Sequence, residues 1–376
     1  MTLDNKMLKS GEQAVFDLRA LYQRYGYAPF KMSKFEEYDL YVENKDFLVG
    51  DGVITFNDTD GKLLALKPDV TLSIIKNSKD ETEGITSKVY YNENVYRISK
   101  NTHTFKEILQ TGLECIGDID IYAMTEVVLL AVKSLEAVSK DYILDLSHIG
   151  ILSALLDQLS VSAADKKQMI RCIGEKNIHG LKEFCSSVGA DPTVCEKLAE
   201  LISAYGKPSV VLPKLRALNA GKVADTAIDE LELITKTLEK VGYGDRVNID
   251  FSVVNDMSYY SGIFFRGFIQ GIPEGILSGG RYDKLMKKIG RKAGAIGFAV
   301  YLDLLELLDA HENEYDTDIL LLYEDGADLC DLMHAVTVLA KNGTRILAQK
   351  RVPEGIRYRQ LLNYRNGGLE ILEIGD

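Results

Sequence analysis

The sequence predicts an α+β protein in which an antiparallel sheet is flanked by helices. Two parts of the chain, residues 47–146 and 250–301, contain several β-branched and aromatic segments bounded by turn residues. Between them, residues 152–247 carry apolar side chains at helical spacing almost throughout. This mix of sheet-type and helix-type segments is consistent with an antiparallel sheet flanked by helices.

Length and composition limit the possible classes of protein. A chain of 376 residues that is 46% hydrophobic can form two or three domains with a large core. A net charge of -12 disfavours a main task of RNA binding, which relies on basic surfaces. The polar N-terminus and the lack of an apolar run of membrane length predict a cytoplasmic protein.

Cysteine and histidine usage gives no sign of a metal site. The five cysteines form no C-x-x-C pair, and the five histidines are scattered. We therefore expect buried thiols, no metal and no cofactor.

The first elements are short and alternate in type. Residues 8–25 are amphipathic and predict a helix that ends at Gly26. Residues 28–41 are compatible with a surface connector or with an interface. Two short strands are expected at 47–57 and 63–66, since a turn composition separates them.

The next segment joins a helix start to two long strands. Pro68 and Asp69 suit the first turn of a helix. Strands are predicted at 87–97 and 105–117, with a loop at 99–104 between them.

Polar residues alternate along the second of these strands. Gln110, Gly112 and Glu114 would point to one face of the sheet. With Arg97 at the end of the preceding strand, they could line a pocket. Alternation by itself favours a solvent-facing surface instead.

The middle of the chain predicts structure without visible chemistry. A helix is expected at 121–138 and a strand at 141–146. His148 follows at a strand–helix junction, where a lone histidine is usually a hydrogen-bonded structural residue. Residues 152–247 predict an inserted helical domain.

The stretch from Asp250 to Leu305 is rich in glycine and tyrosine. Strands are expected at 251–254, 262–269 and 295–300, and Gly279-Gly280 would allow a tight turn or a close approach to a ligand. Tyrosine hydroxyls on rigid rings suit a small polar ligand. A glycine hairpin in an ordinary antiparallel sheet explains the same residues.

The last part of the chain predicts a small α/β unit. The expected strands are 317–323, 344–348 and 369–374, and the expected helices are 329–341 and 355–363.

Several of these strings together resemble histidyl-tRNA synthetases and their paralogues. The strings are Tyr259-Tyr260, Ser278-Gly279-Gly280-Arg281-Tyr282-Asp283, Ala295-Ile296-Gly297-Phe298-Ala299, Lys67-Pro68-Asp69-Val70-Thr71, and Arg97 followed by Gln110-Thr111-Gly112-Leu113-Glu114-Cys115-Ile116-Gly117. The resemblance covers most of residues 7–305 and implies a class-II aminoacyl-tRNA synthetase-like sheet, with residues 28–41 at a homodimer interface.

The same resemblance implies a division into domains and a ligand pocket. The core would be residues 1–150 and 246–312, the helical insertion 151–245, and the C-terminal α/β unit 313–376, which is smaller than a full anticodon domain. The implied histidine-binding residues are Asp69, Thr71, Arg97, Gln110, Glu114, Tyr259, Tyr260 and Tyr282. Carboxylates in this set suit an ammonium group, because such hydrogen bonds are charge-assisted.

Departures from the synthetase pattern fall on the residues that handle ATP. The chain has Asn255 where the family has an arginine, and Asp303-Leu304 where it has Glu-Arg. The loop 98–104 also lacks the acid and the basic turn of the family. Cations on the phosphates stabilise adenylate formation, and neither asparagine nor leucine can supply them. The resemblance therefore implies no catalytic residues here.

The family that fits this combination is the regulatory subunit of ATP phosphoribosyltransferase, which acts in the first step of histidine biosynthesis. Such a chain is not an enzyme. It would assemble as a homodimer within a hetero-oligomer with a short-form catalytic subunit, activate that subunit and could relay feedback by histidine, with no role in tRNA or membrane binding. The alternatives are a working histidyl-tRNA synthetase and a stand-alone histidine-sensing paralogue.

Overall fold

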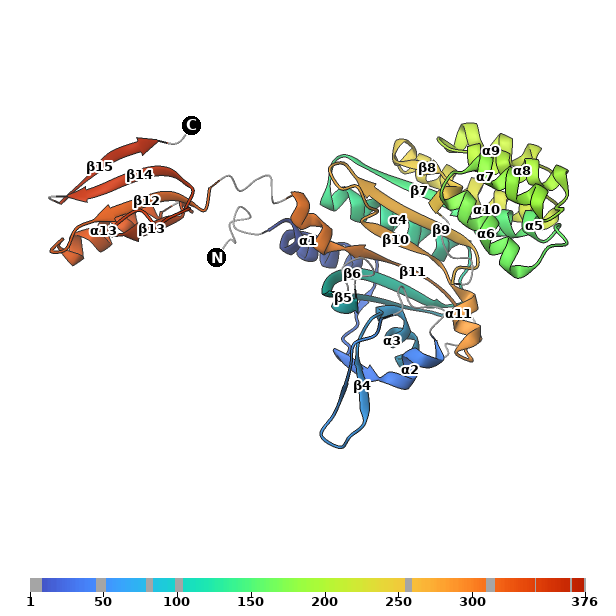
Figure 1. Cartoon of the computed structure of the whole chain (residues 1–376), viewed down its shortest axis with the longest axis horizontal. Helices are drawn as coiled ribbons and strands as arrows, with labels where there is room; N and C mark the ends of the chain where they lie inside the picture. Colours follow the sequence, from blue (N-terminus) through green and yellow to red (C-terminus); the bar gives the residue numbers. More distant parts are fainter. Residues whose placement is uncertain are drawn as a thin grey trace. The chain divides into compact units, whose positions relative to one another are not determined.

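The computed structural model describes residues 9–44, 52–78, 84–98, 104–253, 259–308, 315–341, 343–365 and 367–374. Residues 14–304 form one compact unit, and the strands and helix that follow Leu305 belong to a second (Figure 1). No helix in these described ranges is long and apolar enough to cross a membrane.

The first unit is built on an eight-stranded sheet of order β1-β5-β6-β11-β10-β9-β7-β8 (Figure 1). The inner pairs are antiparallel, while the pairs β1–β5 and β7–β8 at the two edges are parallel. The sheet confirms the predicted α+β class. In sheet order the strands are Ala28–Pro29, Thr86–Ile98, Phe105–Gly117, Gly294–Tyr301, Leu277–Arg281, Ile263–Ile269, Tyr142–His148 and Val247–Ile249.

Two helices cover one face of this sheet. They are α1, Ser10–Arg24, and α4, Ile121–Val138. The hydroxyls of Tyr22 in α1 and Ser134 in α4 share a hydrogen bond of 3.0 Å. A Cβ placed on Gly267 of β9 would lie 2.7 Å from a methyl of Leu135, so α4 packs directly against the middle of the sheet. The face of the sheet opposite α1 and α4 is covered by α2 (Tyr38–Glu43), α3 (Val70–Asn77) and α11 (Asp283–Lys288).

A second, three-stranded sheet of order β2-β4-β3 lies in the same unit. A hydrophobic cluster that includes Tyr41, Ile74, Tyr282 and Met286 joins α2 and α3 to α11. This cluster also includes residues of β5 and β6, so the start of α3 packs against the large sheet. The strands of the smaller sheet are β2 Phe35–Glu37, β3 Thr55–Asn57 and β4 Leu63–Leu66.

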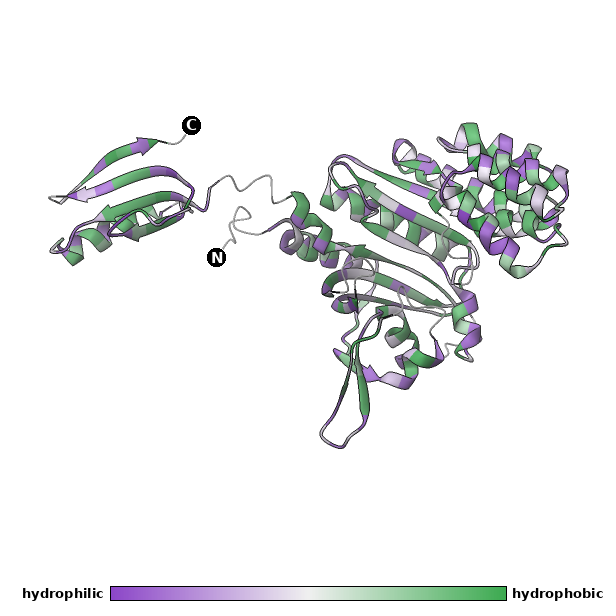
Figure 2. Cartoon of the chain, viewed as in Figure 1, coloured by the Kyte–Doolittle hydropathy of each residue, from purple (hydrophilic) through white to green (hydrophobic). Residues whose placement is uncertain are grey.

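Six helices follow β7 and pack with one another. Figure 2 shows hydrophobic and hydrophilic residues interspersed on these helices, as expected for helices with one buried face. His148 caps the first of them by accepting a hydrogen bond from Gly150 N–H, and its Nε2 lies 3.0 Å from Glu230 Oε2. The histidine thus has the structural role that the sequence predicts. The helices are α5 Ile149–Leu156, α6 Ala163–Gly174, α7 Ile178–Ser187, α8 Pro192–Ser203, α9 Pro208–Ala217 and α10 Lys222–Lys240.

The second unit is a four-stranded sheet with one helix. The strand order is β13-β12-β14-β15, with parallel pairs except for the antiparallel pair β14–β15. Leu332 of the helix packs against Ile319, Leu321 and Leu362 of the sheet. The elements are β12 Thr317–Tyr323, α13 Leu329–Leu339, β13 Ile346–Gln349, β14 Tyr358–Arg365 and β15 Gly368–Ile374.

Two predicted elements are wrong. Residues 355–363 were expected to form a helix, but β14 occupies 358–365 because it pairs with β12 and buries Leu361 and Leu362. Residues 251–253 form a 3₁₀ turn, η4, instead of a strand, and residue 254 lies outside the described residues. Within the strand expected at 47–57, β3 forms residues 55–57, and residues 45–51 lie outside the described residues.

Two smaller expectations also fail. Gly279-Gly280 lies inside β10 rather than in a tight turn. A Cβ on Gly279 would approach the Cβ of Phe298 to 2.3 Å, so the glycine is needed for packing. Cys330 is exposed, whereas the other four cysteines are buried as expected.

Candidate functional site

The candidate site lies on the sheet face opposite α4, where the central strands carry small residues. Gly297 of β11 pairs with Glu114 of β6 on one side and with Gly280 of β10 on the other. A Cβ on Gly297 would lie 1.8 Å from Glu114 Oε2. The glycine therefore leaves room for the carboxyl group to lie flat on the sheet.

The Glu114 carboxyl is the centre of the site. It is 2% exposed and accepts a hydrogen bond of 2.9 Å from the Thr71 hydroxyl of α3. Its other oxygen accepts a hydrogen bond from the Tyr282 hydroxyl, at the start of α11. Burial raises the pKa of Glu114 to about 8, against the opposing effect of these two hydrogen bonds, and the Asp69 charge adds to the rise. The carboxyl is thus largely protonated at neutral pH.

Asp69 supplies a second buried carboxyl. It caps α3, because its side chain accepts a hydrogen bond of 2.9 Å from Leu72 N–H. Burial raises the pKa of Asp69, while the Leu72 hydrogen bond and the positive charge of Arg97 act to lower it. Arg97 Nε donates to the carbonyl of Pro68 at 2.9 Å. The guanidinium of Arg97 thus fixes the segment that precedes α3.

Three tyrosine rings pack together beside the carboxyl groups of Asp69 and Glu114. The ring centroids of Tyr259 and Tyr260 are 4.6 Å apart, and those of Tyr259 and Tyr282 are 5.8 Å apart. Tyr260 also packs on Phe264 at 4.5 Å. Burial raises the pKa of all three phenols, so they remain neutral hydrogen-bonding groups.

Gln110 is buried at the end of the same face with one unmet hydrogen-bond donor. The residue is 3% exposed, and Nε2 has no partner among the described residues. A buried polar group without a partner costs about 1–3 kcal/mol. An amide donor in this position suits a ligand that accepts a hydrogen bond.

The structure places all eight predicted site residues around this face. Asp69, Thr71, Glu114 and Tyr282 are buried, and Tyr259 and Tyr260 are half-buried against them. Arg97 is bound to the carbonyl of Pro68, and Gln110 lies two residues along β6 from Gly112. Asn255 and Asp256 lie outside the described residues.

Two tyrosines of this face are absent from the predicted set. Tyr91 of β5 pairs with Gly112, and a Cβ on that glycine would lie 2.5 Å from the Tyr91 hydroxyl. Tyr301 pairs with Gln110. The alternation that links Tyr91 to Arg97 along β5 would have identified the first of them.

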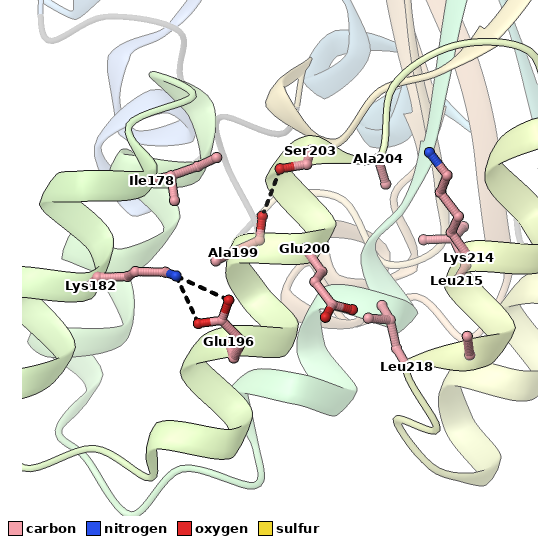
Figure 3. Close-up of a pocket in the computed structure, with 11 residues that line it drawn as sticks. Ile178, Lys182, Glu196, Ala199, Glu200, Ser203, Ala204, Lys214, Leu215 and Leu218 are labelled. Atoms are coloured by element: carbon pink, nitrogen blue, oxygen red, sulfur yellow. Dashed lines mark hydrogen bonds and ion pairs between the residues drawn. The ribbon is translucent and has the colours of Figure 1, made fainter.

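The part of the chain that the structure describes offers no candidate metal site and has a further pocket away from this face. The described residues contain no group of three or more His, Cys, Asp or Glu side chains that could hold a metal ion. A pocket of about 400 Å³ lies among α7, α8 and α9, where Lys182 pairs with Glu196 at 2.8 Å (Figure 3). It contains none of the predicted site residues.

Comparisons with known proteins agree with this fold. A family model described as histidyl-tRNA synthetase matches residues 3–305. A protein of Alkaliphilus metalliredigens named ATP phosphoribosyltransferase regulatory subunit is 27% identical over 360 residues, which cover 93% of this chain and 90% of that protein.

Solved structures show the same fold. A protein from Bacillus halodurans described as an ATP phosphoribosyltransferase regulatory subunit/histidyl-tRNA synthetase is 25% identical, with a TM-score of 0.70 over 90% of this chain and 88% of that one. A chain from an ATP phosphoribosyl transferase complex of Thermotoga maritima is 18% identical, with a TM-score of 0.61 over 78% of this chain and 97% of that one.

Proposed function

Since the chain belongs to the histidyl-tRNA synthetase family, we propose that it keeps a histidine pocket and serves as the regulatory subunit of ATP phosphoribosyltransferase. The observation that supports the proposal is the group of carboxyl, hydroxyl and amide side chains on this face, in a chain that has Asn255 and Leu304 where the family has arginines. The name of the Alkaliphilus metalliredigens relative supports it, because the match covers 90% of that protein.

The pocket has suitable groups for histidine. Asp69 and the Thr71 hydroxyl suit the ammonium group, and Glu114 suits the imidazole ring, while Gln110 offers an amide donor. The tyrosine rings exclude water and hold these groups in place. Arg97, Tyr259, Tyr260 and Tyr282 complete the proposed set.

The phosphate-binding positions argue against adenylate chemistry. Leu304 lies in η5, Leu302–Leu305, directly after β11, and it cannot donate a hydrogen bond or neutralise a phosphate. Asn255 stands where the family has an arginine. Losing such a donor costs about 2.7–4 kcal/mol of transition-state stabilisation, by analogy with oxyanion donors. We infer that the chain is not an enzyme by itself.

In this role, histidine would act through assembly with a catalytic subunit. A bound ligand changes the partner's activity only if it binds the active and inactive assemblies with different affinity. We propose a cytoplasmic hetero-oligomer built on a homodimer of this chain, with residues 28–41 at the dimer interface. The proposed division into core (1–150 and 246–312), helical insertion (151–245) and C-terminal unit (313–376) belongs to the same proposal.

A reconstitution assay tests the proposed function. A short-form ATP phosphoribosyltransferase catalytic subunit is assayed for phosphoribosyl-ATP formation with and without this chain, and then with added histidine. We expect activity only in the mixture, and less activity when histidine is present. If this chain changes nothing and does not co-elute with the catalytic subunit, the regulatory role is wrong.

The family model itself favours one alternative, a working histidyl-tRNA synthetase. Histidine-dependent exchange of pyrophosphate into ATP by the purified chain would establish it. A stand-alone histidine sensor would instead bind histidine and ignore the catalytic subunit.

A further inference from the structure

The proposed pocket leaves one group of the amino acid without an obvious partner, namely its carboxylate. Two arginines stand on the site face of the sheet, Arg97 on β5 and Arg266 on β9. We propose that Arg266 binds the carboxylate of the bound amino acid, a proposal that rests on the histidine site proposed above.

Arg97 is held by a hydrogen bond to the segment before α3. Its Nε donates to the Pro68 carbonyl at 2.9 Å, and its positive charge acts on the buried Asp69. Turning this guanidinium toward the carboxylate would break the hydrogen bond that holds the start of α3.

Arg266 lies at the end of a row of small side chains that crosses the site. It pairs with Ser278 of β10, which pairs with Ala299 of β11, which in turn pairs with Gly112 of β6. Residues paired in register point to the same face of a sheet. The short side chains of Ser278, Ala299 and Gly112 therefore form the floor of the site, between Arg266 and the strand that carries Gln110.

The guanidinium of Arg266 is uncommitted. It makes no hydrogen bond or ion pair within the ranges of the chain that the structure describes. Asp145, its neighbour on β7, accepts a hydrogen bond from Asn248 instead. Arg266 rests 5.6 Å from the centroid of the Phe268 ring, and a Cβ on Gly275 would lie 2.2 Å from Nε. The glycine thus makes a place for the arginine at the edge of the floor.

Gln110 and Tyr301 connect this arginine to the pocket. Gln110 is 3% exposed, its Nε2 has no partner among the described residues, and it pairs with Tyr301. Burial raises the pKa of Tyr301, while the charge of Arg97 lowers it, the charge of Asp69 raises it and the charge of Arg266 lowers it. A carboxylate above the floor could accept from Gln110 on one side and from Arg266 on the other. Two parallel N–H donors make the guanidinium the better carboxylate partner.

The test compares two ligands that differ at this group. L-histidine and L-histidinol, which has a hydroxymethyl group in place of the carboxylate, are titrated calorimetrically into the full chain. The variants are Arg266→Gln, which removes the charge, and Arg266→Lys, which keeps it without the planar fork. Arg246→Gln is the matched control, since Arg246 also lies over an aromatic ring, that of Tyr142, at 4.8 Å.

We expect the wild-type chain and the Arg246→Gln control to prefer histidine. In Arg266→Gln the affinity for histidine should fall on the order of tenfold to a hundredfold, as for a lost hydrogen bond to a charged group. The affinity for histidinol should change much less, so the preference between the two ligands collapses. Arg266→Lys should retain part of it.

Two results would overturn the proposal in distinguishable ways. If Arg266→Gln keeps the wild-type ratio of the two affinities, Arg266 does not bind the carboxylate, while the histidine site stands. If the wild-type chain binds no histidine, the site itself is wrong, and the inference falls with it. A thermal melt of each variant separates a loss of folding from a loss of contact.

Discussion

At the scale of single residues, the site depends on one carboxyl that is kept neutral by its surroundings. Glu114 lies under Thr71 and Tyr282 and over Gly297. The sequence motif identifies Glu114, but its protonation follows from burial, which a local pattern does not reveal. The same holds for Tyr301, whose importance appears only when β11 is seen beside β6.

The first prediction concerns pH and stability. Because the pKa of Glu114 is raised to about 8 in the folded chain, the native state binds a proton that the unfolded state releases near the ordinary value. The free energy of unfolding should therefore fall as pH rises through this window, by up to about 1.4 kcal/mol per pH unit. In Glu114→Gln this part of the pH dependence should vanish, as measured by urea denaturation.

The control is Glu107→Gln, an exposed carboxyl on the same strand. It should leave the pH profile close to that of the wild type. An unchanged profile in Glu114→Gln would show that the buried carboxyl does not carry the proton.

A second prediction concerns the glycine beneath the carboxyl. Gly297→Ala places a Cβ 1.8 Å from Glu114 Oε2 and 2.4 Å from the carbonyl of Leu113. The backbone neighbour cannot move aside, so we expect a loss of about 1–3 kcal/mol in the free energy of unfolding, measured by urea titration. Gly262→Ala meets only the flexible Arg281 side chain, at 3.1 Å, and should cost less. Equal losses would show that the crowding is relieved elsewhere.

At the scale of elements, sequence patterns identify helices and long strands well and short elements poorly. The helix 121–138 begins and ends as predicted, because Asp120 caps it and an apolar face runs along it. By contrast, β14 was mistaken for a helix, since its burial depends on pairing with β12, a partner distant in sequence. For Gly279-Gly280 the local sequence allows a turn or a close approach to a ligand, and the need for glycine inside β10 comes from the neighbouring strands.

The cap of α4 gives the prediction at this scale. Asp120 accepts a hydrogen bond of 2.8 Å from Ala123 N–H at the helix start. Asp120→Ala should lower the free energy of unfolding by about 0.5–2 kcal/mol. Asp120→Asn keeps a side-chain oxygen at the same place and should lose much less in the same denaturation experiment. If both variants lose stability equally, the effect comes from the charge and not from the cap.

At the scale of the whole molecule, the sequence resemblance covers the synthetase-like core, while the chemistry of the pocket could be predicted only as a set of residue types. Asp69 and Glu114 are distant in sequence, and the motifs do not say that a helix cap and a strand would bring them together. The contact of Glu114 with Thr71 and Tyr282, and the unpaired donor of Gln110, are visible only in the assembled sheet.

The prediction at this scale is that a change in the pocket alters how strongly histidine inhibits the proposed complex. Thr71→Val removes the hydroxyl that donates to Glu114 at 2.9 Å. In the reconstituted enzyme, the histidine concentration that halves phosphoribosyl-ATP formation should rise about tenfold, the loss expected for a hydrogen bond to a buried group. Thr226→Val, at an exposed site of α10, is the control. An unchanged half-inhibiting concentration in Thr71→Val would place histidine feedback elsewhere.

The hydrogen bond between Tyr282 and Glu114 joins residues 168 positions apart, on either side of the six-helix segment. During synthesis, chains lengthen by about 5–20 residues per second and fold from the N-terminus. The polypeptide made before Tyr282 emerges from the ribosome carries Thr71 and Glu114. It lacks Tyr282, whose hydroxyl donates to Glu114 in the folded chain. At the proposed histidine site, free histidine would therefore assist folding only after the chain has been made beyond that tyrosine, and it would not act as an early template for the N-terminal half.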